Sequence, residues 1–162
     1  MAGLARSAQK ATKGIAMNNA SQSAKPKGIM WARGFIGLVL VSNLAAAIPF
    51  VFRPERFVGA FELAGVPGRA AVMGVGLLFV MWQVPYAFAL AHPGRHWISV
   101  IEAVLMQLIG LGGETWLLSR IPLEHANLRG SILRFILFDA LGALCLLAAL
   151  GLVLASRRSE ER

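Results

Sequence analysis

The chain contains four long apolar runs, and each run carries one polar side chain near its middle. Each run has about 20 residues or more, which is enough for a helix to cross the hydrocarbon core of a bilayer. An unpaired polar group at that depth is costly, so we expect the four helices to face one another through a polar layer. The runs are 34–52, 70–91, 97–118 and 130–155, and their polar residues are Asn43, Gln83, Gln107 and Asp139.

The composition fits a membrane domain. Of the 162 residues 57% are hydrophobic, whereas soluble domains contain about 45–50%. We therefore predict an all-α fold, an integral membrane four-helix bundle with up-down antiparallel topology, which leaves no stretch for a soluble catalytic domain. The predicted parts are a disordered basic tail (1–27), the helical domain (28–156, with helices at about 28–52, 70–91, 97–118 and 129–156) and a charged C-terminal tail (157–162).

The net charge of +8 would suggest nucleic acid in a soluble protein, but here basic residues cluster beside the spans and act as topology signals. We therefore expect a lipid bilayer as partner and no nucleic acid. An even number of spans places both termini on one side, which holds ten Lys and Arg residues against six on the other. This bias predicts cytoplasmic termini and a multi-pass protein of the cell inner (plasma) membrane.

The N-terminal stretch is basic and rich in Ala and Ser, and the first acidic residue is Glu55. It lacks the apolar segment of a secretory signal peptide, so we interpret it as a disordered tail that attracts anionic lipid. Two alternatives remain open: a transit peptide, with an organellar membrane as the location, and a true start at Met17.

The connections between helices carry further signals. Segment 53–69 mixes charges with aromatic residues, and we expect these rings at the level of the lipid headgroups. Segment 92–96 is so short that the helices it joins must be antiparallel neighbours. Helix 97–118 shows two polar stripes, which predicts that it is the most interior of the four.

Several polar residues are candidates for chemistry. Gln107, Gly110 and Glu114 share one helical face, and with Asp139 they predict a polar pocket for a quinone-like or other small ligand, or a step in a proton path. The alternative is a structural hydrogen-bond layer that fixes helix register. Two further pairings are expected: an ion pair of Glu114 with Arg134, and Glu102 within reach of Arg95 or His96.

Other chemistries have no support in the residues. Pro93 and Gly94 separate His92 from His96, so their spacing is not that of two ligands on one helix. The single cysteine, Cys145, cannot form an intramolecular disulfide. We assign no catalytic residue and no metal site, and we expect no cofactor other than a quinone.

One stretch, PFVFRPERFVGAFELAGVPGRAAVMGVGLLF, resembles the DoxX-like superfamily of small four-helix membrane proteins. The resemblance implies a four-helix bundle. In that superfamily some members are linked to quinone-coupled sulfur oxidation or to redox-stress membrane complexes. The residues that carry the resemblance are Pro54, Phe57, Gly65, Pro67, Gly74 and Gly76.

Taken together, the sequence favours a small subunit of a membrane assembly, next to a redox complex, with other membrane subunits or copies of itself as partners. One alternative is a DoxX-like protein that binds a quinone or other lipid-soluble molecule in the polar layer. Another is a solute or proton carrier that works as a homo-oligomer.

Overall fold

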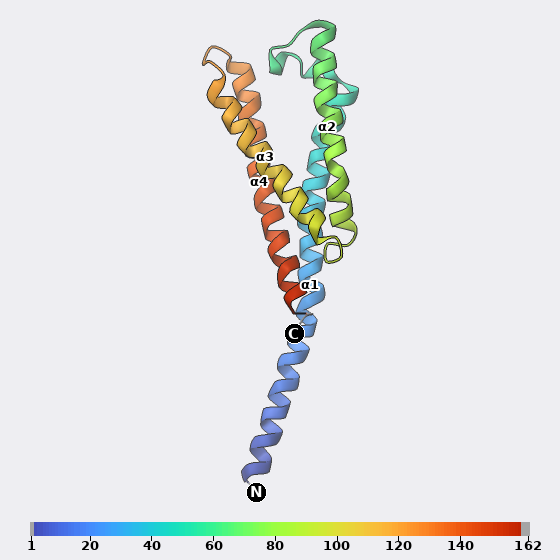
Figure 1. Ribbon diagram of the computed structural model, residues 1–162, viewed down its shortest axis with the longest axis vertical. Coiled ribbons are helices and arrows are strands. Elements are labelled where there is room, and N and C mark those ends of the chain that lie inside the picture. The colour runs from blue at the N-terminus through green and yellow to red at the C-terminus, as the bar shows by residue number, and fades with distance from the viewer. Residues whose placement is uncertain (1, 160–162) are drawn as a thin grey trace.

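The computed structural model describes the backbone of residues 2–159 and the side chains of residues 27–159. Over this part of the chain all regular elements are helical, which confirms the predicted all-α four-helix fold. Four long helices make up the described part of the fold, and two short 3₁₀ helices connect the first two; Figure 1 shows how the long helices are arranged. The elements are α1 (Ala2–Phe52), η1 (Pro54–Arg56), η2 (Gly59–Phe61), α2 (Gly65–Ala91), α3 (Trp97–Arg120) and α4 (Ala126–Arg158).

Each long helix contains a stretch that is long and apolar enough to cross a membrane, and in α1 this stretch is Lys27–Phe52. The fold is thus compatible with a multi-pass integral membrane protein. The C-terminal end of α4 lies at the same end of the four spans as the N-terminal extension of α1 (Figure 1). We call this the inner end, and the end with η1, η2 and the α3–α4 turn the outer end.

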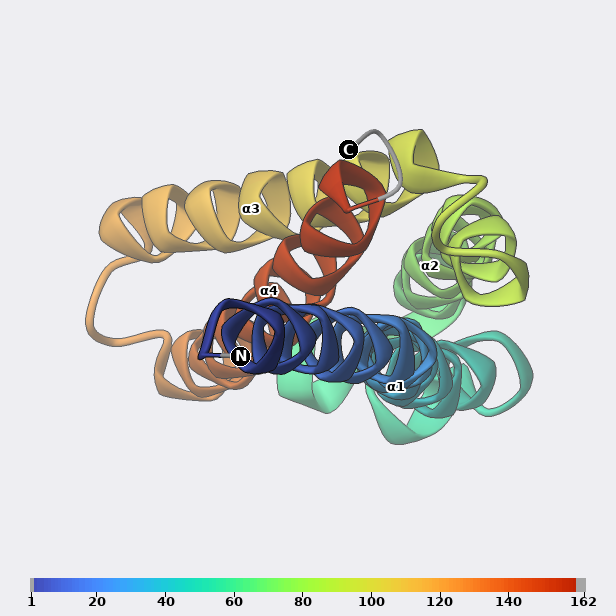
Figure 2. The same cartoon turned by 90° about the horizontal axis from the view of Figure 1, so that it is seen from below.

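The helices do not form a uniform bundle. α1 packs against α2 and α4, and α3 packs against α4. α2 and α3 meet at the inner end, where His92–His96 joins them, and they separate toward the outer end (Figure 1). Seen from below, α4 crosses between α1 and α3, and it packs against both of them (Figure 2).

The inner half holds the hydrophobic core. Its residues are mostly alanine and valine, whose short side chains allow the helix backbones to approach closely in lipid. At the inner end, Arg157 donates to the Gly94 carbonyl (3.0 Å) and lies over the Trp97 ring, which fixes α4 to the α2–α3 turn. This inner core comprises Ala32, Ile36, Val39, Tyr86, Ala89, Val100, Ala103, Val104, Leu146, Ala149 and Val153.

Aromatic rings and loop contacts connect the helices at the outer end. Five phenylalanines from α1, the α1–α2 connection, α2 and α4 have ring centroids 4.5–6.4 Å apart. The rings of the connection therefore pack inward against the helices, and their position at the level of the lipid headgroups stays a prediction. The rings are held against the helices because edge-on and stacked ring contacts are favourable. This outer aromatic cluster is Phe50, Phe57, Phe61, Phe79 and Phe135.

A carboxylate from the α1–α2 connection caps the start of α4. Glu62 Oε2 lies 2.5 Å from His125 Nδ1, and Glu62 Oε1 accepts from the Leu128 backbone N–H (3.2 Å). The His125 side chain itself caps no backbone group of α4, and a negative charge at a helix N-terminus is favourable. Hydrogen bonds from His125 and Leu128 lower the pKa of Glu62 below its ordinary value.

Several predicted boundaries differ from the structure, including the end of α3, which continues to Arg120. α2 begins at Gly65 rather than at Ala70, because Pro67 lies in its first turn, where a missing N–H costs no hydrogen bond. α4 begins at Ala126 and continues through Arg158, so the first two residues of the expected C-terminal tail are helical. The remaining tail residues 160–162 lie outside the described part.

The tail expected to be disordered also differs. The backbone of residues 2–26 continues α1 toward the N-terminus as helix (Figure 1). The stretch is rich in Ala, Lys and Gln, which have high helix propensity, and the span beyond Lys27 supplies the nucleus from which a helix can extend.

Candidate functional site

A cavity of about 460 Å³ lies where α2 and α3 separate. Three of its apolar residues, Trp82, Ile109 and Leu117, are 41–72% exposed, so the cavity reaches the surface between these two helices. In a membrane this surface faces lipid. All four helices contribute to the lining, which consists of Asn43, Phe79, Trp82, Gln83, Tyr86, Met106, Gln107, Ile109, Gly110, Gly113, Glu114, Leu117, Phe138 and Asp139.

The polar residues of the four spans meet at this cavity through two sets of hydrogen bonds. Asn43 Nδ2 donates to Gln83 Oε1 (3.2 Å), which joins α1 to α2. Tyr86 Oη donates to Gln107 Oε1 (2.7 Å), and Gln107 Nε2 donates to Asp139 Oδ1 (2.8 Å), which joins α2, α3 and α4. The expected contact of the helices through polar side chains is therefore present in the geometry.

Two glycines let α3 and α4 approach closely enough for the last of these bonds. A Cβ on Gly142 of α4 would lie 2.6 Å from Gln107 Nε2 of α3, and a Cβ on Gly110 of α3 would collide with Asp139 Oδ2 of α4. Each polar side chain thus lies against a glycine of the opposite helix. The two pairs have the same spacing, three residues along each helix, so each places its members on one face.

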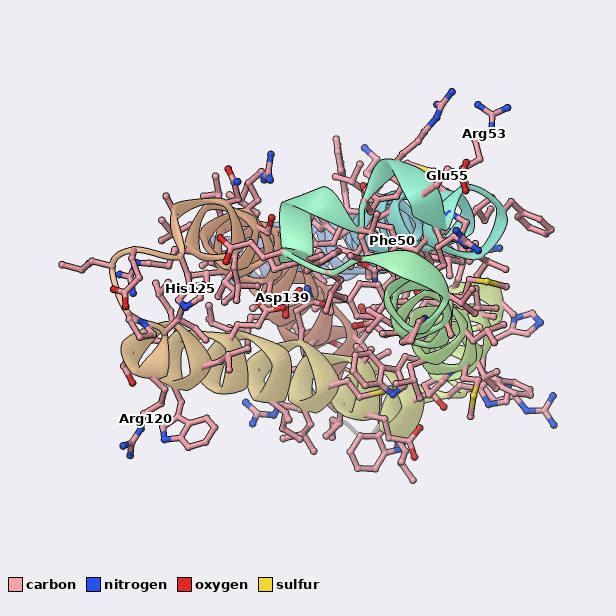
Figure 3. All side chains as sticks on the ribbon, turned by 90° about the horizontal axis from the view of Figure 1, so that it is seen from above. Phe50, Arg53, Glu55, Arg120, His125 and Asp139 are labelled. Carbon is pink, nitrogen blue, oxygen red and sulfur yellow. The ribbon has the colours of Figure 1, made fainter. Side chains whose placement is uncertain are left out.

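The carboxyl groups of the lining keep hydrogen-bonding capacity that the described part of the protein does not use. The Gln107 amide oxygen and one of its N–H groups are used by Tyr86 and Asp139. Glu114 lies about 10 Å farther along α3, and its buried Oε2 has no hydrogen-bond partner among the described residues. Seen from the outer end, Asp139 lies near the centre of the molecule, between α4 and α3 (Figure 3). The lining includes no basic residue.

Two of the sequence candidates lie elsewhere. Arg134 donates to Ser131 Oγ (3.1 Å) and lines a different pocket, so the expected ion pair with Glu114 is wrong: it is absent among residues 27–159. Arg134 and Ser131 are one turn apart on α4, and this local bond draws the guanidinium away from α3.

Glu102 is the other candidate outside the cavity. It is exposed on α3 and forms no ion pair with Arg95 or His96. α3 is also less buried than α1 or α4, so the prediction that it is the most interior helix is wrong. The reason is that α2 and α3 separate toward the outer end, which leaves that part of α3 less covered (Figure 1). A glutamate near a helix end, such as Glu102, can tolerate exposure by extending toward the interface.

Sequence reasoning missed Tyr86, the residue that links Gln107 to α2. Tyr86 is 2% exposed, and the carbonyl of Ala103 is a second acceptor 3.2 Å from its hydroxyl. A signal was available: Tyr86 follows Gln83 by three residues, so both lie on one face of α2. A buried tyrosine hydroxyl nearly always finds a partner.

Metal ligands do not gather in the described part of the chain. Within residues 27–159 no group of three or more His, Cys, Asp or Glu side chains is placed to hold a metal ion. Cys145 is a free, half-buried thiol that packs against the inner core.

Comparison of the chain with protein-family models, with curated protein sequences and with solved structures finds no match. The resemblance to the DoxX-like superfamily stays a prediction.

Proposed function

We propose that this protein binds a lipid-soluble small molecule in the cavity between α2 and α3. The observation that carries the proposal is the combination of an apolar, lipid-facing opening with buried polar groups at its base. Ligand sites are typically concave, mostly apolar and equipped with a few convergent polar groups. Here Phe79, Trp82 and Phe138 supply apolar surface, and Glu114 and Asp139 supply the polar groups.

The hydrogen-bond inventory narrows the chemistry of the ligand. The Glu114 carboxyl has an oxygen without a partner among residues 27–159, while the amides of Gln83 and Gln107 already bond to protein groups. An amphiphile that donates a hydrogen bond, such as a hydroquinone or an amine, would satisfy this oxygen. A lipophilic anion would meet two carboxyl groups without a compensating base, which is unfavourable.

A quinone is one lipid-soluble molecule of this kind, and it is the ligand that the sequence predicts. The hydroquinone form fits the residues better than the oxidised form, because it donates where the quinone only accepts. Glu114 or Asp139 would hold the hydroxyl, and Trp82 and Phe138 would contact the ring. We derive no redox step from these residues.

A matched pair of variants on α3 tests the proposal. Glu114→Met removes the cavity carboxyl and keeps the side-chain volume, while Glu102→Met makes the same change at an exposed site outside the cavity. We expect a short-chain alkyl hydroquinone to bind the wild type and Glu102→Met equally, and Glu114→Met about tenfold more weakly, as for the loss of one hydrogen bond to a charged or acidic group. Calorimetric titration in nanodiscs measures this.

The outcomes separate the ligand site from a purely structural polar layer. If the layer only fixes helix register, the wild type will bind no hydroquinone, and a lipophilic amine of similar size will also fail. Equal weakening by both variants would also overturn the proposal. Stability gives a second readout: Glu114→Met should not destabilise the fold, because the buried oxygen that it removes has no partner in the described part of the chain.

A role as a subunit of a membrane assembly, with cytoplasmic termini in the inner membrane, is the second candidate. The exposed large apolar residues on all four helices support helix contacts outside this chain as well as lipid contacts. Purification in mild detergent followed by native mass spectrometry tests it. Stoichiometric partner subunits would support an assembly, whereas a lone chain that retains a lipid-soluble molecule would favour the cavity alone.

A further inference from the structure

A second pocket, of about 420 Å³, lies at the outer end and shares no lining residue with the first. Four rings of the outer aromatic cluster form its apolar part: Phe50, Phe57, Phe61 and Phe135. In the view from the outer end, Phe50 lies beneath the α1–α2 connection, while Arg53 and Arg120 extend away from the molecule (Figure 3). The pocket therefore lies between the connection and α4.

Its charged groups are two arginines from different elements, Arg56 of η1 and Arg134 of α4, and no acidic residue lines it. Among residues 27–159 the only ion pair is that of Glu62 with His125, so neither arginine is neutralised by a carboxylate. Two exposed guanidinium groups beside one apolar pocket create a positive site with strong hydrogen-bond donors.

A buried serine fixes one of these guanidinium groups. Ser131 is 4% exposed, and its hydroxyl donates to the Ala60 carbonyl (2.6 Å), which joins α4 to η2. The same oxygen accepts from Arg134 Nη2 (3.1 Å). This bond occupies one N–H of Arg134 and leaves the rest of its planar fork for a bidentate oxyanion partner.

Arginines beside membrane spans are usually explained as topology signals, but that role does not explain Arg56 and Arg134. Basic residues mark the cytoplasmic side, but by the same count Arg56 and Arg134 lie on the side that is poorer in Lys and Arg. The pocket also combines charge with aromatic surface, which a topology signal does not require.

We propose that this pocket binds the oxyanion headgroup of an anionic membrane lipid. Arg56 and Arg134 bind the phosphate oxygens, and the phenylalanines contact the apolar part that follows the headgroup. A lipid headgroup and free inorganic phosphate would both offer phosphate oxygens to the arginines. The aromatic surface favours the lipid, since inorganic phosphate has no apolar part to bury.

The test uses the full chain in vesicles of phosphatidylcholine with and without phosphatidylglycerol, and in phosphatidylcholine with added inorganic phosphate. Arg56→Gln with Arg134→Gln is the test variant, and Arg53→Gln, an exposed arginine at the same end outside the pocket, is the matched control. Native mass spectrometry counts the retained phosphatidylglycerol, and the thermal midpoint is measured in parallel.

We expect wild type and Arg53→Gln to retain phosphatidylglycerol and to be stabilised by it, and the double variant to retain it about tenfold less, as for the loss of charge-assisted hydrogen bonds. Arg56→Gln alone, which removes no bond described within the protein, keeps the test valid if the double variant does not fold. Three results would overturn the proposal: an equal loss in Arg53→Gln, stabilisation by inorganic phosphate alone, or no preference for phosphatidylglycerol in the wild type.

Discussion

The inner and outer halves of the four spans use the same helices but differ in packing. In the inner half, alanine and valine side chains are fully or nearly fully buried where all four helices meet. In the outer half, α2 and α3 separate, and both cavities lie at or beyond the level of Gln107. Small side chains therefore bring all four helices together in the inner half, whereas in the outer half ring contacts and hydrogen bonds join some helices and leave space between α2 and α3.

The means of attachment differ as well. The inner half is held by helix-to-helix packing and by Arg157 at the α2–α3 turn. The outer half depends on the α1–α2 connection, through Glu62 at the start of α4 and the Ser131 bond to the Ala60 carbonyl. Loop contacts of this kind open more easily than a packed core. We expect the inner half to supply stability and the outer half to supply the binding sites.

The largest effect is expected from removing side-chain volume in the inner core. Leu146→Ala should lower the free energy of unfolding by about 2–3 kcal/mol, because Leu146 is fully buried and its loss leaves a cavity. Titration with a denaturing detergent in mixed micelles measures the loss. The matched control is Leu144→Ala, a leucine on the same helix that is 65% exposed. If both variants lose the same stability, the inner half is not the packed core.

The next effect concerns a close approach of α1 to α2 at Gly76, in the outer half. A Cβ on Gly76 would lie 2.8 Å from Phe50 Cβ and 3.0 Å from the Ala47 carbonyl oxygen, whereas Gly74 has nothing within 4 Å. Gly76→Ala should cost about 1–3 kcal/mol through overpacking, and Gly74→Ala should be near neutral. The same detergent titration compares them. Equal stability of the two variants would show that α1 and α2 can separate there without cost.

The junction between the halves gives a smaller, more specific effect. Gly142→Ala places a methyl group against Gln107 and should displace it from Asp139, at a cost of about 1 kcal/mol. Hydroquinone binding should weaken together with stability, because the base of the cavity moves. Gly112→Ala, at a glycine of α3 without neighbours, is the control. If hydroquinone binding is unchanged in Gly142→Ala, the ligand site does not depend on the hydrogen bond from Gln107 to Asp139.

The smallest effect is a local pH dependence at the outer end. The pKa of Glu62 is lower in the folded chain than its ordinary value, so the deprotonated carboxylate favours the capped α4. This stabilisation is present above the ordinary pKa of a glutamate and is lost as the pH falls through the lowered value. Amide hydrogen exchange at the first turn of α4, measured relative to the intrinsic rate at the same pH, should therefore lose protection in acid. Glu62→Gln should remove that dependence, whereas Glu124→Gln should keep it.

Sequence reasoning located the four spans and the residues at the base of the cavity. Asn43, Gln83, Gln107 and Asp139 are each the lone polar residue in an apolar run, and hydrocarbon leaves such groups few alternatives to one another. It misplaced Arg134 and Glu102, because a polar residue near a helix end can turn toward water, a local partner or the interface. The periodicity of the sequence does not show whether such a side chain turns toward water, a local partner or the interface.

The sequence by itself determined the four apolar spans and the need for a polar layer, because hydrocarbon requires internally bonded backbone and paired polar side chains. Only the tertiary structure decided that α2 and α3 separate, that Tyr86 joins Gln107, and that Arg56 and Arg134 lie beside one pocket. Those outcomes depend on contacts between residues far apart in the chain, at glycines such as Gly110 and Gly142, where a single added carbon would change how closely two helices approach.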